Sequence, residues 1–577
     1  MENKKPLLRI KELKQYFPIR GKRGVFVKAN DGVSLEIYQG ETLGIVGESG
    51  CGKSTLGRTL LQLYNQTDGQ TMYYGMSLED LAPVYVLDIY KNLEKRCKTA
   101  KHELEQLERL EKEYADLEEK LNSPEQKQEL EDLMALEKEH AQVTKQLKKA
   151  SIEAKDQVPA LKKQQADLVS RINNSPYKDK RKQLYAKMDQ RNNMKRIANR
   201  DFMAIVRLVG GFYAAKDYAT VSSIYTDYYK TNLTIKDINK GLSKLSLKIA
   251  ELEYDVENGK EGADASKLET LKAEHQKISS TALQDAIKQR EAKQAEVDAL
   301  RATYANDADF QNYEQYREDG IDLTMLTKAE MRDLRKDLQL IFQDPYSSLN
   351  PRFTVGQILS EGPMIHGDLV GKNERAQDFI TNIMEDCGLA PYMMHRYPHQ
   401  FSGGQRQRIS IARALSVKPK FVVCDEAVSA LDVSIQSQII NLLQDLKEKE
   451  NLTYMFISHD LSVVKYISDR IAVMYLGNLV ELCTSEELFT NALHPYTEAL
   501  LSAIPTTDID GDKKGMIILE GDIPSPVNPP KGCKFHTRCP KKVGTICEMV
   551  EPVWVEQCPG HFVACHKYTY EPVVAEE

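Results

Sequence analysis

Glycine, lysine and hydroxyl residues are closely spaced in the stretch GESGCGKST, from Gly47 to Thr55. An apolar segment expected to form a strand precedes it, and a helix is expected to begin near Lys53. The glycines allow successive backbone N–H groups to face one centre, and the helix N-terminus adds positive partial charge. Lys53 then reaches the outer phosphates, and Ser54 offers its hydroxyl to Mg²⁺. The pattern predicts a loop that binds a nucleoside triphosphate through Gly47, Ser49, Gly50, Cys51, Gly52, Lys53, Ser54 and Thr55.

Two consecutive carboxylates end a second apolar stretch, Phe421 to Cys424. Asp425 lies at the end of the expected strand, where it can hold Mg²⁺ through water. Glu426 follows it and can polarise the attacking water. Strands that end in an acidic turn are common, so this pattern is weak by itself. Beside a phosphate loop it predicts hydrolysis of the nucleotide.

Two further segments could contact phosphate. Ser402, Gly403 and Gly404 precede an arginine-rich helix and form a second anion site at a helix N-terminus. No lysine accompanies it, so it suits a phosphate that is already held elsewhere. His459 follows an apolar strand, where its imidazole could contact a γ-phosphate. A lone histidine is more often structural, and only the other motifs favour the functional interpretation.

Together these segments resemble the nucleotide-binding subunits of ABC transporters. The resemblance implies that Glu426, His459 and Gln343 act in catalysis, and that Phe17 or its neighbour Tyr16 stacks on adenine. It implies Mg²⁺ contacts from Ser54, Gln343 and Asp425, and further nucleotide contacts from Ser402, Gly403, Gly404, Gln405 and Asp432, the last in a loop over residues 429–432. In this family ATP lies between two subunits, so one set of motifs implies a partner.

Two positions depart from the family pattern. Phe401 stands where many members have leucine before the SGGQ motif, and Ala427 stands where proline is usual. Neither change removes a chemical group that the expected mechanism uses.

These residues must be positioned by an α/β fold. The resemblance implies an ABC-type P-loop ATPase head with a RecA-like core, an antiparallel β-subdomain and a helical subdomain that carries the SGGQ motif. The expected domains are residues 1–75 and 313–490 for the head, residues 76–312 for an inserted α-helical coiled-coil domain, and residues 491–577 for a small cysteine-rich C-terminal domain.

Two stretches narrow the resemblance. IFQDPYSSLNPRFTVGQI follows the apolar strand near Gln343, and HPYTEALLSAIP lies in front of EGDIPSPVNPPKGCKFHTRCP. Both are similar to the ATP-binding subunits of oligopeptide and dipeptide importers, over residues 1–75 and 313–570, and most similar to the second of their two paired ATPases. The resemblance implies a second ATPase subunit, two transmembrane permease subunits and an extracellular peptide-binding protein as partners. It implies a location on the cytoplasmic face of the cell membrane.

Five of the ten cysteines lie in the last 45 residues. In this importer subfamily such cysteines are associated with a four-iron four-sulfur cluster, and the resemblance implies Cys533, Cys539, Cys547 and Cys565 as its ligands, with Cys558 spare. Their irregular spacing does not match the tight Cys-x-x-Cys pairs of structural zinc. Zinc with His536, His561 or His566 remains the main alternative, and free buried thiols are the other.

The insertion is expected to be mostly helical, because apolar residues recur at alternating spacings of three and four, as in coiled coils. Three seams show this pattern: Leu107, Leu110, Tyr114, Leu117 and Leu121; Leu133, Leu136, His140, Val143 and Leu147; and Ile235, Ile238, Leu242, Leu245, Ile249, Leu252 and Val256. Breaks at Pro124, Pro159 and NNSPYKDK favour helices that double back. Replacing residues 80–312 with a linker is therefore expected to leave the head folded.

A basic stretch within the insertion, residues 178–200, has nine Lys or Arg residues against two Asp. A solvated helical face is favoured over an anion-binding surface. The partner of the insertion is not indicated by the sequence.

Composition and alternative families set the remaining limits. The formal net charge of -7 gives no global reason to expect nucleic acid as a partner. The charged N-terminus lacks the apolar core of a signal peptide, and no run approaches the length of a membrane span. A chromosome-maintenance or repair ATPase of the SMC type is the alternative function, but there the coil follows the glutamine-loop lobe, whereas here the insertion precedes Gln343. An ABC-class translation factor would normally carry two cassettes.

Overall fold

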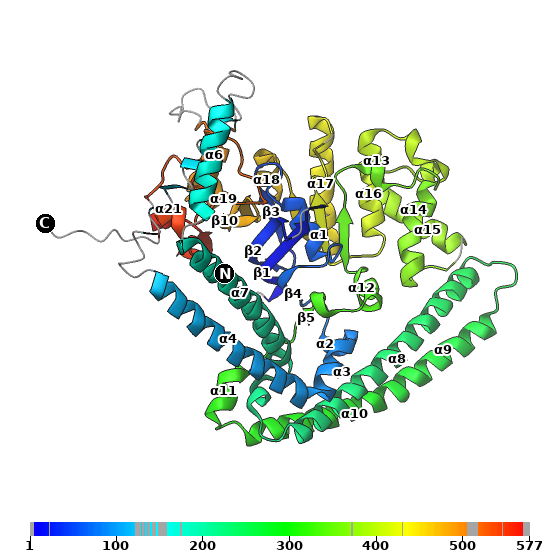
Figure 1. The fold of residues 1–577 in the computed structure, drawn as a ribbon. Helices are drawn as coiled ribbons and strands as arrows, with labels where there is room; N and C mark the ends of the chain where they lie inside the picture. The colour runs from blue at the N-terminus through cyan, green and yellow to red at the C-terminus, as the bar shows by residue number, and fades with distance from the viewer. Residues whose placement is uncertain are drawn as a thin grey trace. The chain divides into compact units, whose positions relative to one another are not determined.

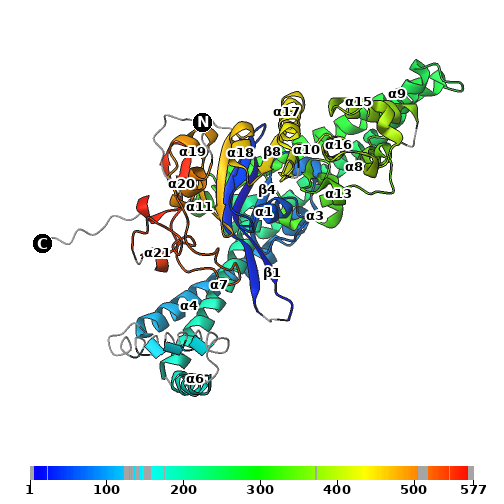
Figure 2. The same ribbon diagram turned by 90° about the horizontal axis from the view of Figure 1, so that it is seen from above.

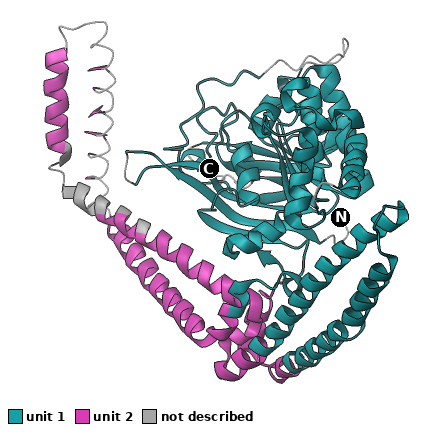
Figure 3. Cartoon of the chain, turned by 90° about the vertical axis from the view of Figure 1, so that its right-hand side faces the viewer, with its two compact units in different colours: residues 1–87, 226–298, 319–577 teal, residues 88–225, 299–318 magenta. Residues whose placement is uncertain are grey.

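The computed structural model describes residues 5–21, 24–121, 158–173, 176–370, 373–429, 431–504, 517–544 and 546–568, with isolated positions between 129 and 147. The chain divides into two compact units (Figure 3). One comprises residues 1–87, 226–298 and 319–577, and the other residues 88–225 and 299–318. Within the described segments, no helix combines the length and the apolar character needed to cross a membrane.

The centre of the first unit is an eight-stranded sheet with the order β11-β12-β10-β9-β3-β8-β7-β6. Strands β9, β3, β8, β7 and β6 are parallel, while β10, β12 and β11 extend the sheet as antiparallel strands. The bounds are β3 Thr42–Val46, β6 Leu338–Ile341, β7 Phe421–Asp425, β8 Thr453–Ile457, β9 Arg470–Tyr475, β10 Asn478–Thr484, β11 Val555–Cys558 and β12 His561–Val563. Most parallel strands are buried along their whole length, as expected for a sheet covered on both faces.

Side chains alternate between two hydrophobic cores along each central strand. Phe421 and Val423 of β7 point into one core, while Val422 and Cys424 point into the other. The first core lies between this sheet and the smaller antiparallel sheet, with α1 (Lys53–Leu60) contributing Leu56. The second is covered by helices of the other face. This double burial fixes the strand ends that carry the expected site residues.

The smaller sheet has the order β2-β1-β4-β5, and it shows where the insertion leaves and re-enters the head. Its strands are β1 Pro6–Pro18, β2 Phe26–Tyr38, β4 Asp68–Tyr73 and β5 Ile321–Asp322. Tyr73 of β4 pairs with Ile321 of β5, so the two ends of the insertion lie side by side.

Helices surround the large sheet in the first unit (Figures 1 and 2). The helical part, α13 to α16, lies on one side of the large sheet. Within it, α13, α14 and α15 each pack on α16. The bounds are α12 Lys328–Leu334, α13 Pro345–Ser348, α14 Val355–His366, α15 Glu374–Asp386, α16 Gly403–Leu415, α17 Val433–Glu450, α18 Leu461–Ile467, α19 Ser485–Thr490, α20 Pro495–Ser502 and α21 Ile546–Met549, with short 3₁₀ turns η3 Leu323–Met325, η4 Pro391–His395, η5 Pro398–Gln400 and η6 His566–Tyr568.

Part of the expected insertion belongs to the first unit. Helix α8 (Tyr218–Glu257) contacts α9 (Ala265–Ser280), since Lys272 pairs with Glu253 at 2.8 Å, and α10 (Ala282–Thr303) follows. The seam from Ile235 to Val256 is buried or half-buried at every position. Leu81, at the end of α2 (Leu78–Leu81), is buried in the core of the head. The boundary of the insertion at residue 76 therefore does not coincide with a break in packing.

The second unit contains α4 (Leu93–Leu121), α6 (Val158–Asn173), α7 (Pro176–Val209), η2 (Gly210–Ala214) and α11 (Ala308–Glu314), while α3 (Val84–Lys91) crosses its boundary. Helices α6 and α7 begin at or next to Pro159 and Pro176, where proline is tolerated. Leu93, Cys97, Ala100 and Leu107 are buried along α4. Four residues of the second seam are described: Val143 is buried, and Leu136, His140 and Leu147 are half-buried. Leu133 and the break at Pro124 fall outside the described residues.

Several described side chains of the basic stretch have partners within the second unit. Lys187 of α7 lies 2.6 Å from Glu113 of α4, and the guanidinium of Arg191 lies 4.2 Å from the ring centroid of Tyr114. Arg200 pairs with Asp201. The interpretation of residues 178–200 as a solvated helical face stays a prediction.

Candidate ATP-hydrolysis site

The phosphate loop follows β3 and requires glycine at two positions. Gly47 has φ 148° and Gly52 has φ 103°, in the region that favours glycine. A Cβ atom at Gly47 would lie 2.2 Å from the Met474 carbonyl oxygen, and one at Gly52 would lie 2.2 Å from that of Ala29. The loop therefore packs too closely against neighbouring backbone for any side chain there.

Lys53 is the first residue of α1 and is 5% exposed. Its amine donates to the carbonyl oxygen of Gly47 at 2.7 Å and to that of Glu48 at 3.1 Å. The positive charge is thus held against the loop that is expected to receive phosphate.

Two expected magnesium ligands are in direct contact. The Ser54 hydroxyl donates to Asp425 Oδ1 at 2.5 Å, and Asp425 is fully buried at the end of β7. Hydroxyl and carboxylate oxygens are the donors that Mg²⁺ prefers. Arg58 also reaches Asp425, with Nη2 3.1 Å from Oδ2. No sequence motif pointed to Arg58, although its position four residues after Ser54 places both on one face of α1.

Glu426 contacts both of the other expected catalytic residues, Gln343 and His459. Gln343 Nε2 donates to Glu426 Oε2 at 2.6 Å, and His459 Nδ1 lies 3.5 Å from Oε1. Glu426 has φ 49°, a left-handed conformation that is uncommon outside glycine. Such backbone strain is often found at functional positions.

The sheet topology explains this convergence. Gln343 follows β6, Asp425 ends β7, His459 follows β8 and the phosphate loop follows β3. These strands are parallel neighbours, so their carboxyl ends meet at one edge of the sheet.

The two candidate adenine-stacking aromatics differ in their surroundings. Tyr16 donates its hydroxyl to Asp31, which also lies 3.0 Å from Lys534 Nζ. Phe17 packs edge-on against Tyr64, with ring centroids 5.2 Å apart. The stacking residue stays a prediction, with both positions open.

The expected SGGQ residues form the start of α16. Ser402 is the N-cap, its side chain accepts from the Gln405 backbone N–H, and the Gln405 side chain accepts from that of Ser402. This reciprocal capping leaves the N-terminus of α16, at Gly403 and Gly404, as a regular helix start. Asp432 is the N-cap residue of α17, while Ala430 of the preceding loop lies outside the described residues.

Comparison with known families and proteins agrees with this geometry. Residues 30–196 and 310–429 match the family ABC transporter, and residues 480–547 match the family Oligopeptide/dipeptide transporter, C-terminal region. The oligopeptide transport ATP-binding protein AppF of Bacillus subtilis is 52% identical over 254 residues, which cover 43% of this chain and 76% of AppF. The chain belongs to the ATP-binding subunits of oligopeptide/dipeptide ABC transporters.

Other members of this transporter family show the same degree of similarity. The oligopeptide transport ATP-binding protein OppF of Salmonella typhimurium is 51% identical over 249 residues, or 43% of this chain and 74% of OppF. The putative oligopeptide transport ATP-binding protein YkfD of Bacillus subtilis is 52% identical over 250 residues, or 43% of this chain and 75% of YkfD. The gap between the two ABC transporter segments lies inside the expected insertion, so the head of this transporter ATPase is interrupted by helices.

The transporter C-terminal region contacts the phosphate loop. The Glu48 backbone N–H donates to the Tyr496 hydroxyl at 2.8 Å. Arg538 donates to both carboxylate oxygens of Glu48, at 2.7 and 3.1 Å. Neither contact could be predicted from the sequence, because Arg538 and Glu48 are 490 positions apart.

Four tail cysteines are neighbours in the structure. Burial raises the pKa of the Cys533 thiol to about 12, and the nearby thiols of Cys565, Cys539 and Cys547 raise it as well. Cys533 also donates its backbone N–H to the Cys547 carbonyl oxygen at 2.9 Å. Cys558 is exposed. Cys547 is buried and the other three are half-buried. The set of ligands named from the sequence stays a prediction.

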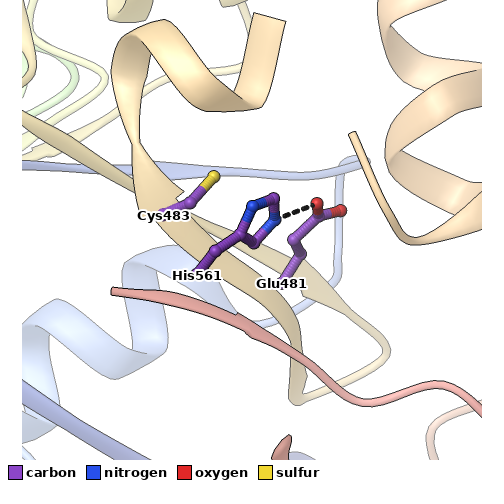
Figure 4. Close-up of side chains that lie close together, drawn as sticks. All are labelled: Glu481, Cys483 and His561. Carbon is purple, nitrogen blue, oxygen red and sulfur yellow. Dashed lines mark hydrogen bonds and ion pairs between the residues drawn. The ribbon is translucent and has the colours of Figure 1, made fainter. Parts of the chain in front are cut away.

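The three tail histidines have other partners. His536 and His566 each have a ring nitrogen 2.8 Å from a backbone carbonyl oxygen, of Cys533 and Val550 respectively. His561 lies 2.8 Å from Glu481 (Figure 4).

Proposed function

We propose that this chain hydrolyses ATP to power uptake of oligopeptides or dipeptides through membrane partners. The observation that carries the proposal is the convergence of Gln343 and His459 on Glu426, beside Asp425 and the phosphate loop. The peptide substrate is taken from the relatives, since AppF and OppF are named oligopeptide transport proteins.

Each residue has a distinct task in this scheme. Lys53 exchanges its carbonyl partners for phosphate oxygens, and the loop N–H groups surround the same phosphates. Glu426 accepts a proton from the attacking water, with Gln343 and His459 orienting its carboxylate. Ser54, Asp425 and Gln343 would hold Mg²⁺, which neutralises charge on the phosphates. Phe17 or Tyr16 supplies an aromatic face for adenine.

A second ATPase subunit completes the site in this proposal. Ser402, Gly403, Gly404 and Gln405 at the start of α16 would contact the nucleotide held by the partner's phosphate loop. Asp432 would lie at the same subunit boundary. The chain carries one such set, so a heterodimer with a related ATPase is the proposed assembly, at the cytoplasmic face of the membrane with an extracellular peptide-binding protein.

The helical part offers a surface for the two permease subunits. Thr354, Gln357, Ile380 and Met394 line a pocket formed by α14, α15 and η4. The nearby large apolar side chains of Ile365 and Tyr392 are 63% and 67% exposed. An exposed apolar surface around a pocket is typical of a docking site.

Uptake in cells tests this function. The gene is deleted and complemented with wild type, Lys53→Ala or Tyr392→Ser, and uptake of labelled peptides is measured. Lys53→Ala should abolish uptake while still co-purifying with the permeases, whereas Tyr392→Ser should reduce co-purification. Wild-type uptake by Lys53→Ala would contradict the proposal, and uptake of a different solute class would contradict its peptide part.

We propose further that Cys533, Cys539, Cys547 and Cys565 bind a four-iron four-sulfur cluster. Four thiolates on one tetrahedral zinc lie about 3.8 Å apart. Among the described residues, the one group of three or more such donors within 4.8 Å of one another is Glu481, Cys483 and His561, so the tail thiols are spaced more widely. Wider spacing suits several irons better than one zinc. The cluster would cross-link the loop-rich segments of the tail through its four cysteine ligands.

Iron and sulfide analysis of anaerobically purified protein tests the cluster. Cys539→Ser should lose the brown colour and the iron, while Cys558→Ser, at the exposed thiol, should retain both. Stoichiometric zinc without iron would support the alternative site instead.

We propose that the helices of the insertion pack as coiled coils, since the seam from Ile235 to Val256 is buried or half-buried.

A further inference from the structure

Two arginines of α16 reach the chain segment that carries Gln343. Arg406 and Arg413 lie seven positions apart on this helix, which is nearly two full turns, so their side chains leave the same face. The segment runs from Phe342, which follows β6, through Gln343 to Ser348 at the end of α13. The proposed ATP hydrolysis uses Gln343 but gives neither arginine a task.

Arg413 contacts residues on both sides of Gln343. Its guanidinium carbon lies 5.7 Å from the ring centroid of Phe342, the residue before Gln343. Its Nη1 donates to the carbonyl oxygen of Ser348, on the other side of Gln343, at 2.5 Å. One side chain therefore bridges the two ends of the segment.

Arg406 holds the middle of the segment. Its guanidinium carbon lies 3.6 Å from the ring centroid of Tyr346, and its Nε donates to the Pro398 carbonyl oxygen at 2.7 Å. Arg406 is 6% exposed and Tyr346 is 68% exposed, so the ring covers the buried cation. Arginine stacks on aromatic faces because its planar guanidinium is weakly hydrated and is attracted to the negative face of the ring.

Carbonyl oxygens and aromatic rings hold both arginine charges. Within the part of the chain that the structure describes, neither guanidinium forms an ion pair, and their hydrogen bonds go to the backbone carbonyl oxygens of Pro398, His399 and Ser348. Burial lowers the pKa of the Arg413 guanidinium more than the charge of Glu361 raises it. A buried cation without a counter-charge costs free energy, so stability alone does not explain two of them on one helix face.

Gln343 depends on its surroundings to stay in place. It is an exposed residue, and its Nε2 donates to Glu426 Oε2 at 2.6 Å. An exposed glutamine side chain loses entropy when it is held in one rotamer. Anchoring the backbone before and after Gln343 limits where its amide can lie, and the Asp344 side chain strengthens this segment as the N-cap of α13.

We propose that Arg406 and Arg413 are positioning residues that hold residues 342–348 on α16, so that the Gln343 amide meets Glu426. This inference rests on the proposed ATP hydrolysis, and it places neither guanidinium in contact with the nucleotide. The helix that begins with the SGGQ motif thereby also fixes Gln343 in the chain's own site.

Hydrolysis by the assembled transporter tests the positioning role. Arg413→Gln should lower kcat by about tenfold, because a displaced Gln343 orients Glu426 poorly, while the Kd for ATP stays that of wild type because the phosphate loop is unchanged. Arg413→Lys keeps the charge but not the planar fork, and its kcat should lie between those of wild type and Arg413→Gln. Arg408→Gln is the matched control and should behave as wild type, because Arg408 lies on the same helix but donates to the Cys387 carbonyl oxygen.

A Gln343→Ala background separates positioning from a general structural role. In that background, Arg413→Gln should reduce kcat no further, because the side chain that it positions is absent. A further loss as large as in the wild-type background would show that Arg413 acts on the fold, and a wild-type kcat in Arg413→Gln alone would also overturn the proposal. A normal rate in Glu426→Gln would instead refute the proposed function.

The exposed ring of Tyr346 offers a variant that leaves the buried arginines in place. Tyr346→Phe keeps the ring and should hydrolyse ATP normally. Tyr346→Ala removes the contact with Arg406 and should lower kcat by about threefold at an unchanged Kd for ATP and an unchanged Tm. Equal kcat values in Tyr346→Phe and Tyr346→Ala would show that this contact does not position Gln343.

Discussion

At the residue scale, Glu48 joins the nucleotide loop to the C-terminal region. Its backbone carbonyl accepts from Lys53, its backbone N–H donates to Tyr496, and its side chain pairs with Arg538. The Arg538 and Glu48 side chains are 8% and 24% exposed, so solvent screens this pair only in part. We infer that Arg538 positions the loop without contacting ATP.

Replacing Arg538 tests this positioning role. Arg538→Gln should weaken ATP binding by about threefold to tenfold, since a charged hydrogen bond contributes about 1.5–3 kcal/mol and only part of it acts on the loop. Arg538→Lys keeps the charge but loses the two-pronged geometry, and should lie between wild type and Arg538→Gln. The measurement is the Kd for ATP, with kcat as a second value. Loss of kcat at unchanged Kd would argue against positioning.

Asp31 gives a pH-dependent contribution to stability. Burial alone would raise the pKa of its carboxyl, but the charge of Lys534 and the hydrogen bond from Tyr16 outweigh it and hold the pKa below the ordinary value of 3.8. The stabilisation is therefore present above about pH 4 and is lost as the pH falls through the lowered pKa. Urea unfolding of wild type and Asp31→Asn should differ at pH 7 and converge below about pH 4. A constant difference at all pH values would exclude the charge network.

At the element scale, an inserted helix contacts the helical part of the head. Glu251 of α8 pairs with Arg375 of α15 and bonds Asn373, the N-cap of that helix. Tyr254 donates to Asp378. Because α15 packs on α16, these contacts connect the insertion to the SGGQ motif.

A double-mutant cycle measures this contact. The coupling free energy between Glu251→Ala and Arg375→Ala should be about 1 kcal/mol in urea unfolding, since their side chains are 17% and 25% exposed. The matched control is the more exposed pair Glu253 and Lys272, for which a clearly smaller coupling is expected because solvent screens it. Equal coupling in both pairs would mean that α8 does not brace α15.

Much of the phosphate-binding loop, the catalytic strand end and the inserted helices could be predicted from the sequence. The glycine spacing, the carboxylate pair and the seam from Ile235 to Val256 each follow from a local pattern with a local physical cause. Periodicity shows that a helix buries one face, but it does not show what covers that face, so the contact of Glu251 with Arg375 was not expected. The contact of Arg538 with Glu48 depends on how a distant loop packs, and the pair of Cys483 with His561 depends on strand register between distant segments. No local pattern reports either.

At the scale of the whole molecule, the insertion is not one removable domain. Residues 226–298 group with the head, and Leu81 is buried in its core. Tyr229 donates to the Pro83 carbonyl, and Lys236 to that of Leu81. These contacts weigh against the expectation that residues 80–312 can be replaced without loss of the head. The four-domain division itself stays a prediction.

A shorter deletion should be tolerated. Tyr114 and Lys187 lie on facing parts of α4 and α7, so a short Gly/Ser linker can replace residues 115–186. That protein should remain soluble and bind ATP with wild-type affinity, while the protein that lacks residues 80–312 should be insoluble or lose ATP binding. Peptide uptake by the shorter deletion then reports whether the arm is needed for transport. An insoluble short deletion would show that α4 and α7 stabilise the head.

Single-turnover hydrolysis by Glu426→Gln, in the assembled transporter, is the most direct test of ATP hydrolysis at this site. The amide keeps the shape of the carboxylate but cannot accept a proton from water, so the hydrolysis rate should fall by about 100-fold or more. ATP should still bind with an affinity close to that of wild type, because Lys53 and the loop are unchanged. Glu450→Gln, a change on the exposed end of α17, is the matched control and should hydrolyse ATP normally. A wild-type rate in Glu426→Gln would contradict the assignment of Glu426 as the proton acceptor.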